Sequence, residues 1–228
     1  MAEIDLRRDG DVFVLQMKTG ENRFNPDFIA AMNRALDEVE ASKGAAALVT
    51  TGDGKFYSNG LDLDWLTQQE HADGMKFLAT VLQLFARIVA FPVATCAALN
   101  GHTFAGGAML ALAHDWRIMR NDRGFFCFPE IDLGMGLCHG MRTLIKEKLD
   151  PRVFRDSILT GGRYGADDCV RLGMVDEAAS EAEVLARAIE RVRPLAGKNR
   201  EACRALKRGM YGELIEDLTG PRAVTIPQ

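Results

Sequence analysis

The spacing of hydrophobic positions changes several times along the first half of the chain. An apolar run at 12–17 predicts a strand, and the charged segment before it can serve as its hairpin partner. From Pro26 onward, apolar residues recur at helical spacing, and Asn25 is placed to cap that helix. Short apolar runs at 45–51 and 92–99 are typical of buried parallel strands. These segments predict alternating strands and helices.

The same alternation continues to about residue 120 and then stops. Further helices are predicted at 74–88 and 106–112, and a third buried strand at 116–119. Strand followed by helix in this order favours an α/β domain with parallel pairing. From about residue 150 the strand signals vanish, and helices are predicted at 153–159, 166–171, 181–193 and 198–218. The body of the chain therefore reads as α/β and its tail as helical.

Composition and charge narrow the class of protein. The chain has 228 residues, of which 47% are apolar and 26% charged, enough for one substantial core. A net charge of −4 provides no general basic surface for nucleic acid. The five cysteines are widely spaced and form no metal or disulfide pattern, and the longest apolar stretch is interrupted by polar residues. We expect a cytoplasmic protein with no nucleic-acid, membrane, metal or redox-cofactor function.

Two glycine-containing loops are the first candidates for chemistry. Gly60 and Gly106 both follow apolar strand segments and lead into predicted helix starts. Without a Cβ, the backbone can approach a ligand there, and helix N-termini offer free N–H groups to an anion. Any one of these glycines is more often a turn or packing residue. Two such loops together indicate a site that binds an anion or oxyanion.

A carboxylate follows an aromatic segment further along the chain. Glu130 comes directly after Phe-Phe-Cys-Phe-Pro at 125–129. Apolar surroundings raise the pKa of a carboxylate and make it a better base near neutrality; the alternative is a surface glutamate at a strand end. Asp62 can simply cap the helix that follows it. Glu130 and the glycine loops together suggest proton transfer beside a stabilised oxyanion, which is enolate chemistry next to a carbonyl.

Several motifs are shared with a known family. They are Lys-Phe-Tyr-Ser-Asn-Gly-Leu-Asp at 55–62, Asn-Gly-His-Thr-Phe-Ala-Gly-Gly at 100–107, Pro-Glu-Ile-Asp-Leu-Gly at 129–134, and the segments 161–168 and 171–176. In combination they resemble the crotonase superfamily of enoyl-CoA hydratases and isomerases. The resemblance implies a core of repeated ββα turns over residues 1–176. It also implies a helical region at 177–228 that covers the site or forms trimer contacts.

The resemblance also implies a ligand, an acyl-CoA thioester, with no separate cofactor. The thioester oxygen would lie between the backbone N–H groups of Leu61 and Gly106, the positions that match the oxyanion hole. Coenzyme A would be held by Asn22, Arg23, Phe24 and, more loosely, Lys207. The family usually assembles as homotrimers or hexamers, so the same is expected here.

Departures from the family pattern narrow the reaction. Hydratases use two glutamates, and the first of these positions is Met109 here, whereas the second is retained as Glu130. Cys138 replaces the additional aspartate of the dienoyl-CoA isomerases. A single carboxylate resembles the Δ3,Δ2-enoyl-CoA isomerases of fatty acid β-oxidation. Glu130 would move a proton from C2 to C4, within acyl-pocket walls formed by Met109, Phe126 and Leu137.

Two other functions remain open from the sequence. A 2-enoyl-CoA hydratase would need a second carboxylate, for which Asp62, Asp64 and Glu70 are candidates. A non-catalytic acyl-CoA-binding homologue would be expected to have lost Glu130 or to have blocked its glycine loops, and neither change is present.

Overall fold

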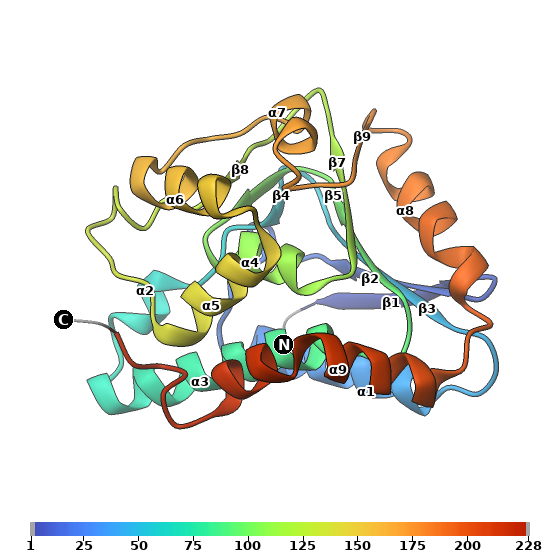
Figure 1. The fold of residues 1–228 in the computed structure, drawn as a ribbon, viewed down its shortest axis with the longest axis horizontal. Coiled ribbons are helices and arrows are strands. Elements are labelled where there is room, and N and C mark those ends of the chain that lie inside the picture. Colours follow the sequence, from blue (N-terminus) through green and yellow to red (C-terminus); the bar gives the residue numbers. More distant parts are fainter. Residues whose placement is uncertain (1–2, 227–228) are drawn as a thin grey trace.

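Two β-sheets form the centre of the molecule. The computed structural model describes residues 3–226. The large sheet has the order β1-β2-β3-β5-β7-β9 and the small one β4-β6-β8 (Figure 1). Their bounds are β1 Ile4–Asp9, β2 Val12–Met17, β3 Ala47–Gly52, β4 Phe56–Ser58, β5 Thr95–Leu99, β6 His102–Phe104, β7 Trp116–Arg120, β8 Phe126–Cys127 and β9 Glu177–Ala179. Strands β1 and β2 form the expected antiparallel hairpin, and the other strand pairs are parallel.

Helices follow the strands in a repeating order. They are α1 Pro26–Ala41, α2 Leu63–Leu66, α3 His71–Val89, α4 Gly106–Ala113, α5 His139–Lys148, α6 Pro151–Thr160, α7 Ala166–Arg171, α8 Val184–Val192 and α9 Arg200–Thr219. A strand of the large sheet, a short strand of the small sheet and then a helix recur as β3-β4-α2, β5-β6-α4 and β7-β8-α5. This is the ββα turn that the family resemblance implies. Asn25 caps α1 as predicted, accepting a hydrogen bond from the Phe28 amide.

The large sheet separates two hydrophobic cores. Because side chains alternate along a strand, Phe13 and Leu15 of β2 face the larger core with α1, α3 and α4, whereas Val12 and Val14 face the other side. Helix α8 packs on that second side, against β3, β5 and β7. Figure 1 shows α8, in orange, across the sheet from α4. The cavity described below lies on the α4 side.

The expectation of no strand beyond residue 150 is wrong. Strand β9 pairs in parallel with β7 and extends the large sheet. Its sequence, Glu177-Ala-Ala179, contains no apolar run, so its pairing with β7 rather than its own hydrophobicity makes it a strand. The large sheet and its covering helix α8 therefore extend past residue 176, and α9 with residues 220–226 forms the helical end.

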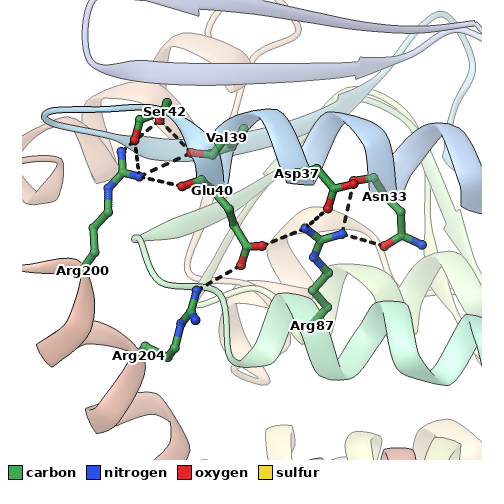
Figure 2. Close-up of polar contacts among 8 residues, drawn as sticks. All are labelled: Asn33, Asp37, Val39, Glu40, Ser42, Arg87, Arg200 and Arg204. Atoms are coloured by element: carbon green, nitrogen blue, oxygen red, sulfur yellow. Dashed lines mark hydrogen bonds and ion pairs between the residues drawn. The ribbon is translucent and has the colours of Figure 1, made fainter.

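Arginine side chains hold α3 and α9 against α1. Arg200 of α9 donates hydrogen bonds to the carbonyl oxygens of Glu40 and Ser42 at the end of α1 (Figure 2). Arg87 of α3 pairs with Asp37 and Glu40, and Arg204 also reaches Glu40. A cation at the last carbonyls of a helix is favourable because those groups lack intrahelical partners. In the described part of the chain, no helix is long and apolar enough to cross a membrane.

Candidate active site

One cavity of about 640 Å³ brings together Leu61, Gly106 and Glu130. Arg23, Asn59 and Asp64 are polar residues of its lining. Much of its wall is apolar and comes from α2, α3, α5, the loop before α5 and the segment after α9, through Leu66, Met75, Phe77, Leu78, Leu133, Met135, Met141 and Ile226. The three residues predicted to carry the chemistry are thus neighbours in space, although they come from three separate turns of the chain.

The two glycine loops meet at the start of α4. Gly60 has φ +77°, and a Cβ on it would lie 2.6 Å from the Gly106 nitrogen. Phe24 bridges to the first loop, since its N–H donates to the Gly60 oxygen at 2.7 Å and its oxygen accepts from Asp62 at 3.0 Å. Within residues 3–226, the N–H groups of Leu61 and Gly106 donate to no backbone or side-chain acceptor. Two unused donors are therefore held close together at the cavity.

Helix α4 gives this region a rigid support. Each of its residues from Gly106 to Ala113 is buried, which is the expected behaviour of a helix that is apolar on every face. Ala105, before the helix, has φ +50°, so the chain turns sharply into the first helical residue. A Cβ on Gly107 would lie 2.3 Å from the Ser58 oxygen, so only glycine fits at this contact.

Glu130 is a buried carboxylate in the cavity wall. The residue is 9% exposed, and its Oε2 atom has no hydrogen-bond partner among the described residues. Desolvation raises the pKa of Glu130 to about 7, while a hydrogen bond from its own backbone N–H acts in the opposite direction. This is the environment that its aromatic neighbours in sequence suggested. A carboxyl group with this pKa can both accept and return a proton near neutrality.

The other candidate carboxylates have different surroundings. Asp62 caps α2 by accepting from the Trp65 amide at 3.2 Å, as the sequence suggested. Asp64 pairs with Arg23 at 2.7 Å, and its side chain is 85% exposed. Glu70 lies at the exposed start of α3, on the cavity lining. Within residues 3–226, Glu130 is the only buried carboxylate on this lining.

The predicted acyl-pocket residues lie elsewhere. Met109 and Phe126 are fully buried in the main core, and Leu137 packs against that core; none of the three lines the cavity. Met109 stands one turn into α4, which is enclosed on all sides, so its side chain points into the protein interior. Apolar residues of α2, α3, α5 and the loop 131–137 line the cavity instead. The sequence signal for α3 was present, but periodicity alone did not show that its apolar face meets a cavity.

Only one of the residues predicted for coenzyme A from segment 22–24 lines the cavity, Arg23. Asn22 is buried, has φ +50°, and donates from Nδ2 to the Tyr57 oxygen at 3.0 Å. Phe24 is buried and stacks on Phe28 with ring centroids 5.1 Å apart. Both side chains stabilise the turn that presents Arg23, and neither lines this cavity.

Lys207 is also placed away from the cavity. Its Nζ donates to Asp115 at 2.6 Å and to the Val93 oxygen at 2.9 Å, and its side chain is 9% exposed. Asp115 in turn accepts from the backbone and hydroxyl of Thr95. Because its charge is neutralised inside the protein, Lys207 fixes α9 to the body of the chain and does not line the cavity.

The matches to known proteins decide the family. The family model for enoyl-CoA hydratase/isomerase matches residues 7–225. The chain belongs to the enoyl-CoA hydratase/isomerase family. It is 35% identical to enoyl-CoA delta isomerase 3 of Arabidopsis thaliana, over 96% of this chain and 98% of that protein. It is 34% identical to the peroxisomal enoyl-CoA delta isomerase 2 of the same plant, over 92% of each chain.

Solved structures agree with the fold. A probable enoyl-CoA hydratase from Mycobacterium tuberculosis superimposes with a TM-score of 0.88, at 26% identity, over 94% of this chain and 91% of the other. The crotonase-like arrangement of ββα turns, with a helical C-terminal region, is therefore confirmed. Residues far apart in sequence, such as Leu61 and Glu130, lie on one cavity as this arrangement requires.

Proposed function

We propose that this protein is a Δ3,Δ2-enoyl-CoA isomerase, which moves the double bond of a 3-enoyl-CoA to the conjugated 2-trans position. One observation carries the proposal: a single buried carboxylate with a pKa near 7 shares an apolar cavity with two unused backbone N–H donors. The isomerase names of the two plant relatives agree with it. Coenzyme A enters as part of the substrate, and Arg23 at the cavity is the residue we assign to its phosphates.

The proposed reaction needs one base that works twice. The Glu130 carboxylate takes the proton from C2 of the 3-enoyl thioester, and the electron pair moves into the thioester carbonyl. The N–H groups of Leu61 and Gly106 bind the oxygen of the resulting dienolate, where each such donor contributes about a hundred- to thousandfold in rate. The Glu130 carboxyl then returns the proton to C4, the C3–C4 double bond is lost and the C2–C3 double bond forms.

The lining favours isomerisation over hydration. Apolar side chains such as Met75 and Leu78 exclude water, which protects the dienolate and keeps the proton on Glu130. A hydratase needs a second group to orient water. Asp64 and Glu70 lie on the lining, but both are exposed and Asp64 is paired with Arg23. Hydration is thus the second candidate, and these two carboxylates are the groups that would perform it.

The test compares two reactions and matched variants. Trans-3-hexenoyl-CoA is supplied and the absorbance of the conjugated thioester is followed, with hydration of crotonyl-CoA measured alongside. Glu130→Gln should lower isomerase kcat by about a hundred- to ten-thousandfold, whereas Glu70→Gln, an exposed carboxylate on the same cavity, should leave it nearly unchanged. Wild-type turnover in Glu130→Gln would refute the mechanism. Hydration faster than isomerisation, lost in Glu70→Gln or Asp64→Asn, would establish the hydratase.

We also propose that the chain assembles as a homotrimer or a hexamer. Leu206 and Met210 of α9 are 67% and 64% exposed, which is unusual for large apolar side chains on one helix. Burial of this face against another copy would remove it from water. Sedimentation of the wild type and of Met210→Glu measures the assembly directly, and a monomeric wild type would contradict it.

A further inference from the structure

Residues 220–226, after α9, fold back onto the first turn of α5. The His139 N–H donates to the Thr225 oxygen at 2.8 Å, and the Gly140 N–H donates to the Ala223 oxygen at 2.9 Å. These amides belong to the first turn of α5, where no intrahelical acceptor exists. Ala223 is 4% exposed, so the segment packs as well as pairs. It is therefore fixed to α5 in a defined register.

This register places Ile226 on the cavity lining. A Cβ on Gly136 would lie 3.2 Å from the Ile226 Cγ2 atom, so Ile226 abuts the loop before α5. Leu133 and Met135 of that loop, and Met141 of α5, are on the same lining. Figure 1 shows the red segment leaving α9 toward the side of the molecule that carries α2. The end of the described chain is thus part of the cavity wall.

The lining is polar beside the oxyanion-binding groups and at Gln69, Glu70 and His71 near the start of α3, and mainly apolar along the rest of α3, the loop before α5, and α5. Arg23, Asn59 and Asp64 are polar, and Arg23 is next to the Phe24–Leu61 bridge. Met75, Leu78 and Met141 come from α3 and α5 and are apolar, as is Ile226. A thioester carbonyl held by Leu61 and Gly106 has its coenzyme A part on the polar side. The apolar residues up to Ile226, which is 48% exposed, are then the part of the lining that can contact its acyl tail.

We propose that Ile226 forms the far wall of the acyl part of the cavity and sets the longest acyl chain that the protein accepts. The inference rests on the proposed function and adds a residue that determines substrate length. One methylene too many or too few in an apolar site changes kcat/KM about tenfold or more. A smaller or larger side chain at position 226 should therefore shift the preferred acyl length.

A pair of opposite variants tests this assignment. Across a series of 3-enoyl-CoA thioesters of increasing chain length, Ile226→Ala should raise the ratio of long-chain to short-chain kcat/KM about tenfold. Ile226→Trp should lower the same ratio by a similar factor. Leu159→Ala is the matched control, because Leu159 is 62% exposed on α6 and does not line the cavity. The ratio of long-chain to short-chain kcat/KM in Leu159→Ala should equal that of the wild type.

A binding measurement separates this proposal from the proposed function. Calorimetric titration with saturated acyl-CoA of the same lengths needs no turnover, so the preferred length is measured even if the protein isomerises nothing. If the preferred acyl length shifts in opposite directions in the two variants, the result supports Ile226 as the far wall of the acyl part of the cavity. An unchanged length preference in both variants, or an equal loss for every length, would overturn it.

Discussion

Glu130 loses most of its hydration and gains only a hydrogen bond from its own backbone N–H, which leaves Oε2 without a partner among the described residues. Its ionised form is disfavoured by burial, which raises its pKa from the ordinary 4.5 to about 7. As a base it must be ionised in the free enzyme. We therefore expect kcat/KM for isomerisation to rise about tenfold per pH unit below pH 7 and to level off above it. A plateau that extends down to pH 5 would contradict a base with this pKa.

Ionisation of Glu130 should raise activity but lower the stability of the folded protein. The unfolded chain releases the Glu130 proton near pH 4.5 and the folded chain only near pH 7, so stability is lost as the pH rises through this interval. The difference corresponds to as much as about 3 kcal/mol above pH 7. Glu130→Gln should thus be strongly impaired in catalysis yet more stable than the wild type at pH 8, with little difference in stability at pH 4. Urea unfolding at the two pH values measures this.

At the scale of the elements, the meeting of the Gly60 loop with the start of α4 decides whether the two donors are aligned. Gly60→Ala adds a Cβ 2.6 Å from the Gly106 nitrogen and should lower kcat about a hundredfold, because one donor is displaced. Gly44→Ala is the control, since Gly44 has a similar φ of +82° but nothing within 4 Å of its added Cβ. Both variants carry the backbone penalty, so equal kcat values would refute the role of the contact.

The elements that could be predicted from sequence are those whose own residues are apolar in a regular pattern. Strands β2, β3, β5 and β7 and helices α1 and α3 were predicted close to their observed positions for this reason. Strands β4, β6 and β8 are two or three residues long, too short for any period to be visible. They exist because successive turns of the chain stack, which is a property of the tertiary structure.

In the candidate site, likewise, only residues with a local sequence signal could be predicted. Glu130 follows an aromatic segment and Gly106 is a glycine at a helix start, so each has a local signal in the sequence. Both residues lie on the cavity. The acyl wall and most of the coenzyme A contacts have no such signal. Met109 is near Gly106 in sequence, yet the direction of a helical side chain and the complete enclosure of α4 turn it away from the cavity. Nearness to Gly106 in the sequence therefore does not place Met109 on the cavity lining.

At the scale of the whole molecule, α9 is attached to the body through a buried ion pair. Lys207→Met leaves Asp115 without its charged partner and should cost about 3 kcal/mol of unfolding free energy. Because Lys207 lies away from the cavity, KM for the acyl-CoA should stay within about twofold. Lys146→Met, at an exposed position on α5, should change neither quantity. A rise in KM for Lys207→Met that Lys146→Met does not share would show that Lys207 takes part in coenzyme A binding.

The complete burial of α4 has a consequence for how the cavity wall exchanges with solvent. Amide hydrogens of α4 beyond its first turn should exchange with deuterium only when the whole domain unfolds, because their residues are buried, whereas the free Gly106 N–H at the cavity should exchange readily. Across the cavity, Ile131, Leu133 and Met135 are 48%, 52% and 42% exposed, and their segment should exchange through small local openings. The acyl-CoA would then lie between a slowly exchanging wall that holds its carbonyl and a rapidly exchanging wall that admits its tail.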